Sequence, residues 1–336
     1  MMEIQPTTEL TALFNSKIAC AKSCWRKYYW TYVRNFERNG FYEPFFVGSA
    51  CHAGLEAFYL GKSEESVIRA AEKYMDEYVF KNFVHDMALE RSEKARMLVT
   101  GILHGYVHSH KAEAKNTNVV FTERTIEIPM PGAGVPYVGT IDLAIEKRRR
   151  IWIVDHKFYR TIDENVVRGL KIDPQVQMYM LMMRSAYGEK VGGCIYNMVK
   201  KPMIRQKKAT KNKAEESRVD FLLRLEECFT QKGAEYMVRE RVPFSKKDTR
   251  MSFIDTHQWS MLLRIMHDRS EKTLLNPNAW PKSTKACFEF GTSNKCEFFD
   301  LCRNHCTGNG VNQMGFRQRT GLERGDVIKT ALKIDV

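Results

Sequence analysis

Two β-rich segments joined by a turn constrain the fold of this chain more than any other feature. The turn, at 129–136, holds three prolines and two glycines, residues that end regular structure. The predicted strands lie at 119–128, 137–146, 151–154 and 193–199, and a helix is predicted at 174–186. Strands interrupted by a helix favour an α/β class, with a central mixed sheet flanked by helices.

Helical patterns lie on both sides of this β-rich middle. Apolar residues recur every three or four positions over 63–80, and helices are also predicted at 92–112, 214–240 and 256–271. Thr256 would serve as the N-cap of the last of these. The expected architecture is therefore a small sheet with helical insertions before and after it.

Charge and composition narrow the functional class. The chain has 336 residues and a formal net charge of +13, which favours a polyanionic partner such as nucleic acid. At 43% hydrophobic residues it can bury a core. Its apolar runs are shorter than the ~18–20 residues of a membrane span, and no export signal is recognised. We therefore expect a soluble, cytoplasmic protein that does not bind membranes, in which nine cysteines favour metal ligation over disulfides.

The sharpest chemical signal is a pair of acids with a lysine. Asp142 ends the sequence Gly-Thr-Ile-Asp, and Asp155 and Lys157 follow a short apolar strand. Side chains two apart on a strand share a face, so Asp155 and Lys157 project together. Carboxylates that bind Mg²⁺ beside a lysine suit phosphodiester hydrolysis. A structural Asp–Lys pair at a strand end is the alternative.

The order of these motifs resembles a known family. The Gly-x-Ile-Asp and Asp-x-Lys sequences precede Gln175 and Tyr179, which match the Gln-x-x-x-Tyr signature of the RecB-like branch of the PD-(D/E)XK nucleases. The chain is similar to the CRISPR-associated and phage-encoded RecB-like exonucleases of that branch. This resemblance implies a restriction-endonuclease-like core and Mg²⁺- or Mn²⁺-dependent hydrolysis of DNA.

The resemblance also assigns roles to individual residues. His52, within Gly-Ser-Ala-Cys-His-Ala-Gly-Leu-Glu, matches the early helix whose histidine completes the metal site. By this analogy His52, Asp142, Asp155 and the main-chain carbonyl of His156 bind the metal. Lys157 positions the attacking water, and Gln175 and Tyr179 hold the lysine or the substrate. Glu123 opens the β-rich hairpin; a metal ligand or a residue that supports one is a possible role for it, and a salt-bridged strand end is the favoured interpretation.

Four cysteines match the ligands of an iron–sulfur cluster in that branch. Cys24 precedes an Arg-Lys-Tyr-Tyr stretch, and the late ligands would be Cys287, Cys296 and Cys302. The resemblance implies a 4Fe-4S cluster held by four thiolates. Cys306 competes with Cys287 for its place and Cys20 with Cys24. Four thiolates can also hold Zn²⁺, so zinc stays open.

A basic run follows the last predicted strand of the middle region. Lys207, Lys208 and Lys211 belong to it, and lysines there would neutralise backbone phosphates of DNA without reading its sequence. A solvated loop is the alternative. The sequence has no helix-turn-helix, zinc-finger or Walker A pattern, so duplex sequence recognition and self-powered unwinding are not expected.

We expect one RecB-like nuclease domain at 1–306 and a C-terminal tail at 307–336. Within the domain we distinguish the first cluster cysteine and histidine helix (12–60), a helical insertion (61–115), the catalytic core (116–200), a helical part (214–275) and a cluster-binding segment (287–306). The predicted protein is a single-strand DNA exonuclease acting in recombination, repair or phage DNA metabolism, with a helicase or recombination protein as a possible partner. The bacterial or phage-infected cell is its expected setting. An endonuclease, a flap nuclease and a non-catalytic DNA-binding subunit are the alternatives.

Overall fold

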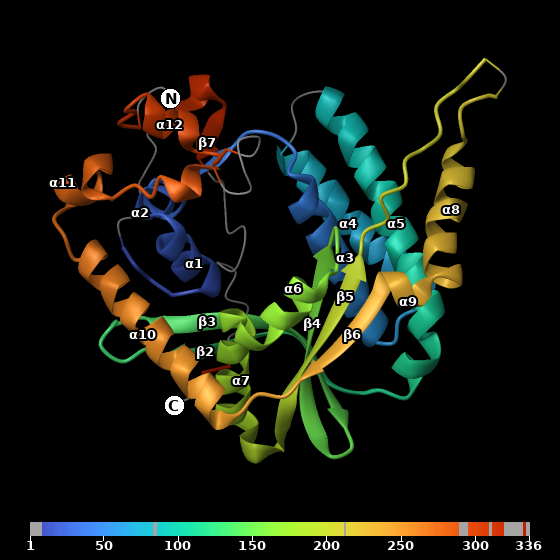
Figure 1. The fold of residues 1–336 in the computed structure, drawn as a ribbon, viewed down its shortest axis with the longest axis horizontal. Helices are drawn as coiled ribbons and strands as arrows, with labels where there is room; N and C mark the ends of the chain where they lie inside the picture. Colours follow the sequence, from blue (N-terminus) through green and yellow to red (C-terminus); the bar gives the residue numbers. More distant parts are fainter. Residues whose placement is uncertain are drawn as a thin grey trace. The chain divides into compact units, whose positions relative to one another are not determined.

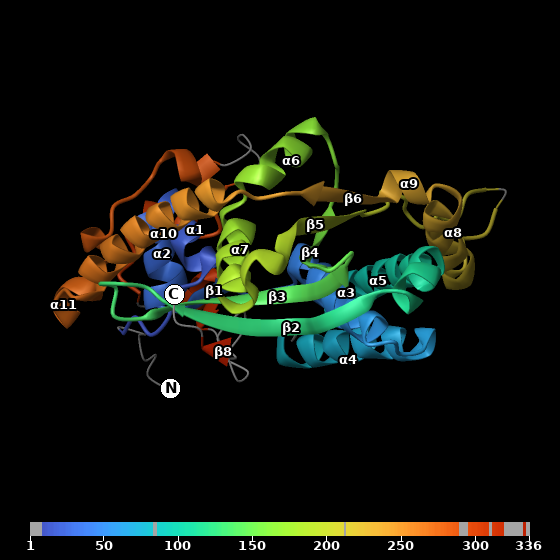
Figure 2. The same ribbon diagram turned by 90° about the horizontal axis from the view of Figure 1, so that it is seen from below.

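A mixed sheet organises the structure, a computed structural model that describes residues 9–82, 86–211, 213–288, 295–308, 311–318 and 332–333. The strand order is β6-β5-β4-β3-β2-β8, and Figure 2 shows β6 to β2 in this order. β4 runs parallel to β5, whereas β3 and β6 run antiparallel to their neighbours β4 and β5. The predicted α/β class with a central mixed sheet flanked by helices is confirmed.

The strands extend the predicted ones at both ends. Their bounds are β1 Phe36–Arg38, β2 Asn118–Pro129, β3 Pro136–Lys147, β4 Arg150–Tyr159, β5 Val191–Lys200, β6 Met237–Val242, β7 Phe316–Gln318 and β8 Leu332–Lys333. β4 continues well past the expected 151–154 because it pairs with β5 along its whole length. Between β3 and β4, Arg148 and Arg149 both have positive φ, as a two-residue type I′ hairpin turn requires.

Helices make up most of the remaining described chain. The longer ones are α1 Asn15–Ser23, α3 Glu43–Tyr59, α4 Glu64–Asn82, α5 Asp86–Lys115, α7 Pro174–Tyr187, α8 Arg218–Gln231 and α10 Lys246–His267. The short ones are α2 Trp25–Tyr28, α6 Glu164–Gly169, α9 Gly233–Tyr236, α11 Glu271–Leu274 and α12 Phe299–Arg303. None of the helices in the described part of the chain is long and apolar enough to cross a membrane.

Two predicted helices differ from the observed elements. The helix expected over 214–240 ends at Gln231, and residues 237–242 form β6 instead, because they pair with β5. The helix expected at 256–271 starts ten residues earlier, at Lys246, so that Thr256 is a buried residue of α10 and not its N-cap. At β6 the pairing with β5 overrides the local helical pattern.

The described residues pack as two units, and the larger one comprises Gly40–Arg124 and Ile141–Ser245. Its apolar core lies between α3, α4 and α5, which lie side by side in Figure 1, and α8 packs on α5. Gly105 permits the close approach of α5 and α8, since a Cβ there would lie 2.3 Å from the Cβ of Phe229. α3 contacts β4, and α7 contacts both β4 and β5.

The second unit comprises Met1–Asn39, Thr125–Thr140 and Lys246–Val336. Buried aromatic side chains hold it together: Trp280 stacks on Tyr28, and the Trp280 indole donates to the carbonyl of Leu274. The predicted division of the sequence into a nuclease domain and a tail stays a prediction. Residues 309–310, 319–331 and 334–336 of that tail lie outside the described residues.

Candidate active site

The candidate active site begins where two strands of the larger unit stop pairing. The antiparallel ladder between β3 and β4 runs as far as Leu143 and Val154, and Asp142 and Asp155 are the next residues beyond it. The backbone N–H of His156 donates to Asp142 Oδ2 at 2.8 Å. The carboxylate therefore satisfies a backbone donor beyond the end of the ladder and is fixed by it.

Three side chains converge there in a group that can hold a metal ion. His52 Nδ1 lies 3.6 Å from Asp142 Oδ2 and 3.8 Å from Glu123 Oε1. One ligand atom from each residue lies within 4.8 Å of the others. α3 supplies the histidine, β2 the glutamate and β3 the aspartate. Oxygen and imidazole donors at this spacing suit a divalent cation such as Mg²⁺ or Mn²⁺.

Glu123 corrects the interpretation drawn from the sequence. It lies within β2 and not at a strand end, and its carboxylate faces the imidazole of His52. Its φ of 42° falls in the left-handed region, which is rare for a residue with a Cβ. Strained backbone of this kind recurs at functional sites. A strand pattern carries no signal of such a kink, so the sequence could not show where this carboxylate points.

A chain of hydrogen bonds continues from Asp155 into α7. Lys157 Nζ donates to Asp155 Oδ1 and to Gln175 Oε1, each at 3.1 Å. Gln175 Nε2 donates to the Tyr179 hydroxyl at 2.7 Å. The structure therefore brings together the predicted Asp-x-Lys and Gln-x-x-x-Tyr residues. Asp173, which the sequence analysis did not single out, caps α7 by accepting from the Gln175 backbone N–H at 2.9 Å.

Charge and burial act against each other in this group. Burial lowers the pKa of His52, but Asp142 and Glu123 outweigh it and raise this pKa to about 9. Burial raises the pKa of Asp142 and of Asp155 above their ordinary values, and His52 and Lys157 only partly offset it. The carboxylates of Asp142 and Asp155 are therefore more stable with a proton or a cation bound than as free anions. A divalent cation meets the same demand, and its binding would release protons.

Asp155 provides an independent test of whether a cation fits. Its side chain is 2% exposed, and its Oδ2 atom accepts no hydrogen bond from any described residue, although Lys157 Nζ lies 3.1 Å away. The Lys157 ammonium pairs with this oxygen but makes its hydrogen bond to Oδ1, so Oδ2 keeps an acceptor position that a metal ion could take. The residues therefore fit a metal ion. Direct metal contacts by Asp155 and by the His156 carbonyl stay predictions.

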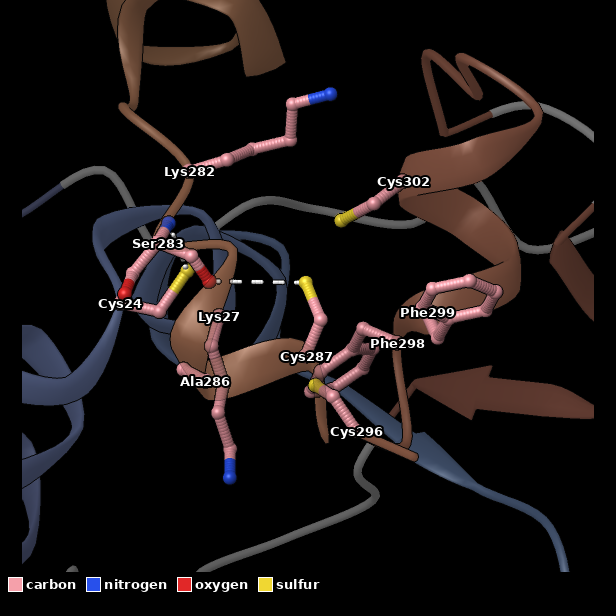
Figure 3. A pocket seen from close by; sticks show the side chains of 10 residues that line it. All are labelled: Cys24, Lys27, Lys282, Ser283, Ala286, Cys287, Cys296, Phe298, Phe299 and Cys302. Carbon is pink, nitrogen blue, oxygen red and sulfur yellow. Dashed lines mark hydrogen bonds between the residues drawn. The ribbon is translucent and has the colours of Figure 1, made fainter. Parts of the chain in front are cut away.

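The second predicted centre lies in the other unit, around a small pocket. Cys24 lines it from the N-cap of α2, Cys287 from the 3₁₀ turn Lys285–Phe288, and Cys302 from α12. Cys296 also lines it, and Figure 3 shows the four with Lys27 and Lys282. The backbone N–H of Ser283 donates to Cys24 Sγ at 3.4 Å.

The two competing cysteines do not line this pocket. The Cys306 thiol instead contacts the sulfur of Met314 at 3.4 Å. Burial raises the pKa of Cys20 to about 12 and the pKa of Cys296 to about 11. Either thiol ionises at neutral pH only if a metal replaces its proton, so the place of Cys296 in the pocket, and not its pKa, separates the two.

A comparison with protein families accounts for this arrangement. The family model described as the PD-(D/E)XK nuclease superfamily matches residues 15–303. The chain belongs to the PD-(D/E)XK nuclease superfamily. This membership implies phosphodiester hydrolysis with a divalent metal, and the His52, Glu123 and Asp142 group supplies a place for it.

Other comparisons add little to the superfamily assignment. No curated protein matches the chain. A solved structure titled "Crystal structure of SSO0001" is similar at 12% identity, over 75% of this chain and 90% of that one. Its TM-score of 0.28 is too low to carry an argument about this PD-(D/E)XK protein.

The predicted DNA-contacting lysines lie on an arm of the larger unit. Lys207, Lys208 and Lys211 are exposed on the segment that joins β5 to α8, which extends past α8 in Figure 1. Glu216 anchors this arm by pairing with Arg224 and by accepting from the Lys207 backbone N–H at 2.9 Å. The lysines are therefore held on a tethered segment.

Proposed function

We propose that the chain is a Mg²⁺- or Mn²⁺-dependent deoxyribonuclease that degrades single-stranded DNA from an end. The convergence of His52, Glu123 and Asp142 beside the Asp155–Lys157 pair carries this proposal. The metal would polarise the scissile phosphate and activate a water molecule. Lys157, fixed by Asp155 and Gln175, would orient that water or offset charge on the phosphate.

Preference for single strands and ends rests on the resemblance to RecB-like exonucleases. Covalently closed single-stranded circles and the same DNA made linear separate the alternatives. An exonuclease degrades the linear form and spares the circle. Equal loss of both forms would favour an endonuclease, and cleavage only at branched junctions would favour a flap nuclease. The complete set of acids with Lys157 argues against a non-catalytic DNA-binding subunit.

The arm lysines support the choice of nucleic acid as substrate. Each phosphate neutralised by Lys207, Lys208 or Lys211 adds about 0.7 to the slope of log binding constant against log salt on a single strand. Replacing all three with Ala should therefore flatten that slope by up to ~2. An unchanged slope would favour the alternative that the arm is a solvated loop without DNA contacts.

We also propose that Cys24, Cys287, Cys296 and Cys302 hold a 4Fe-4S cluster with a structural role. All four line one pocket, and the Ser283 N–H bond to Cys24 Sγ is of the kind that tunes such clusters. Around one zinc ion, thiolate sulfurs lie about 3.8 Å apart, from a Zn–S bond of ~2.3 Å. Among the cysteines in the described residues, no three sulfurs lie within 4.8 Å of one another. This spacing does not identify the bound group, and the choice of a cluster over zinc rests on the resemblance to the iron–sulfur branch.

Iron and sulfide analysis of anaerobically purified protein tests the cluster. A brown protein with iron and acid-labile sulfide near 4:4 is expected. A colourless protein with one tightly bound zinc would overturn the cluster and leave the nuclease proposal standing.

The proposed setting is recombination, repair or phage DNA metabolism. The sequence has no Walker A motif, so a helicase or recombination protein would have to supply unwound DNA. Pull-down of such a partner with the catalytically inactive protein is the direct test.

A further inference from the structure

A buried hydrogen-bond network lies on the opposite side of β4 from Lys157. Side chains two apart on a strand share a face, so His156 points away from Asp155 and Lys157, toward α3 and α5. There its ring stacks on Tyr59 of α3, with the ring centroids 5.7 Å apart. From that network we propose that Asn197 and Arg239 are positioning residues of the metal centre, acting through His156. This inference rests on the proposed nuclease function.

Asn197 fixes the orientation of the His156 ring. Asn197 is fully buried on β5, and its Nδ2 atom donates to His156 Nδ1 at 2.7 Å and to the Tyr106 hydroxyl at 3.0 Å. Its Oδ1 atom accepts from Arg239 Nε at 3.0 Å. Because a guanidinium only donates, Arg239 fixes which end of the amide faces His156. Nδ1 of His156 is therefore the acceptor, and the neutral ring carries its proton on Nε2.

Arg239 ties the same network to both neighbouring helices. Its Nη2 atom donates to the hydroxyls of Tyr59 on α3 and Tyr106 on α5, at 2.9 and 2.8 Å. Nη1 donates to Glu113, also on α5. One guanidinium thus links β6, β5 and two helices. Since buried polar networks are costly when incomplete, each member restricts the positions of the others.

Two contacts connect this network to the metal ligands. The His156 backbone N–H donates to Asp142 Oδ2, and the His156 ring meets the ring of His52 edge-on at 6.0 Å between centroids. Tyr59, which Arg239 holds, lies seven residues after His52 on the same helix. A shift of His156 therefore moves two ligands on different elements. Partners of this kind, which orient the ligands of a metal, are worth about 10–100-fold in metal affinity or activity.

A cavity beside Arg239 makes the role of its guanidinium testable by chemical rescue. The cavity has a volume of about 240 Å³, and Tyr59, Glu113, Arg239 and Arg241 are among its lining residues. Truncating Arg239 would open a space continuous with it, into which a free guanidinium ion can diffuse. Arg241 provides a matched control on the same strand. It lines the same cavity and stacks on Trp152, and it makes no hydrogen bond with Asn197 among the described residues.

The experiment measures Mn²⁺ affinity by electron paramagnetic resonance, together with cleavage of linear single-stranded DNA. Arg239→Ala should bind Mn²⁺ about 10–100-fold more weakly than wild type, and millimolar guanidinium should restore part of both readouts. Arg241→Ala should match wild type with and without guanidinium. Asn197→Asp, nearly isosteric, replaces the donor to His156 with an acceptor and should weaken Mn²⁺ binding without lowering the melting temperature in proportion.

Wild-type Mn²⁺ affinity and cleavage in both Arg239→Ala and Asn197→Asp would overturn the inference. A loss in Arg239→Ala that guanidinium leaves unchanged, together with wild-type behaviour of Asn197→Asp, would also overturn it by showing a purely structural role. If Arg239→Ala fails to fold, Asn197→Asp decides alone. Wild-type protein that neither binds Mn²⁺ nor cuts DNA would contradict the proposed function itself, which is a distinguishable result.

Discussion

Asp155 shows at the scale of one residue why this site requires a cation. Its Oδ1 atom accepts from Lys157, while its buried Oδ2 atom has no hydrogen bond within the described chain. Leaving such an acceptor unsatisfied costs about 1–3 kcal/mol, and more for a charged group. A divalent ion held by His52, Glu123 and Asp142 would offset this cost if Asp155 also binds it, and that contact stays a prediction.

Lys157→Ala should separate chemistry from metal binding. Lys157 donates to Asp155 and Gln175 and is not among the metal-holding residues. Removing a fixed donor near a reacting oxyanion costs about 10²–10³-fold in rate. We expect a loss of that size in single-turnover cleavage, with Mn²⁺ still bound. Lys147→Ala, on β3, is the control, and cleavage by Lys157→Ala at the wild-type rate would refute the assignment.

Glu123→Gln should weaken metal binding by at least about tenfold. The substitution keeps the size of the side chain and removes the charge that faces His52. Glu127→Gln, on the same strand, should have no effect. Calorimetric titration with Mn²⁺ compares wild type, Glu123→Gln and Glu127→Gln. Equal affinities of all three would show that Glu123 has only a structural role.

Sequence patterns predicted much of the site because short motifs supply its chemical groups. Asp142, Asp155 and Lys157 lie in motifs whose order is informative, and the structure places them together. Glu123 was considered as a possible ligand but interpreted as a strand end, and Asp173 was not singled out. The first depends on a positive φ within β2, and the second acts as a helix cap, so neither follows from spacing.

At the scale of elements, local patterns succeeded where one period dominated. The helices at 64–82 and 174–187 and the hairpin of β2 and β3 follow their predicted ranges closely. Local patterns did not predict β6, because β6 pairs with β5, and the arm and α8 separate the two strands in the sequence. The sequence of a short edge strand does not reveal such a partner.

Cys296→Ser should damage stability before chemistry. A cluster bound by Cys24 and Cys296 links residues far apart in sequence, and by analogy with a disulfide its loss removes about 2–5 kcal/mol. The variant should lose colour, melt at a lower temperature and aggregate. Cys228→Ser should do none of these, because Cys228 lies on α8, outside the cysteine pocket, where its thiol donates to the Arg224 carbonyl. Melting curves and iron content decide, and an unchanged Cys296→Ser protein would contradict the cluster.

At the scale of the whole molecule, acid should weaken the fold through a half-buried histidine, His110. Burial lowers the pKa of His110 to about 4, and Arg239 adds to the effect. The unfolded chain takes up a proton there below about pH 6.5. The stability contributed by neutral His110 is therefore complete above pH 6.5 and is lost as the pH falls toward 4.

Urea unfolding in EDTA at pH 7 and pH 5 tests whether stability falls with pH as expected. The free energy of unfolding should fall at pH 5, and His110→Gln should reduce the fall. His108→Gln, exposed on the same helix, should behave as wild type. An equal fall in wild type and His110→Gln would show that other groups govern acid stability.

The whole molecule carries a net charge of +13 and a metal-binding group on its sheet, and both point to a metal-dependent nuclease. The most direct test is a cleavage assay with end-labelled linear single-stranded DNA, comparing wild type and Asp155→Ala in Mg²⁺, in Mn²⁺ and in EDTA. The account predicts loss of the DNA with wild type in at least one metal, and intact DNA in EDTA and with Asp155→Ala in every condition. DNA that survives wild type in both metals, or that Asp155→Ala degrades at the wild-type rate, would contradict it.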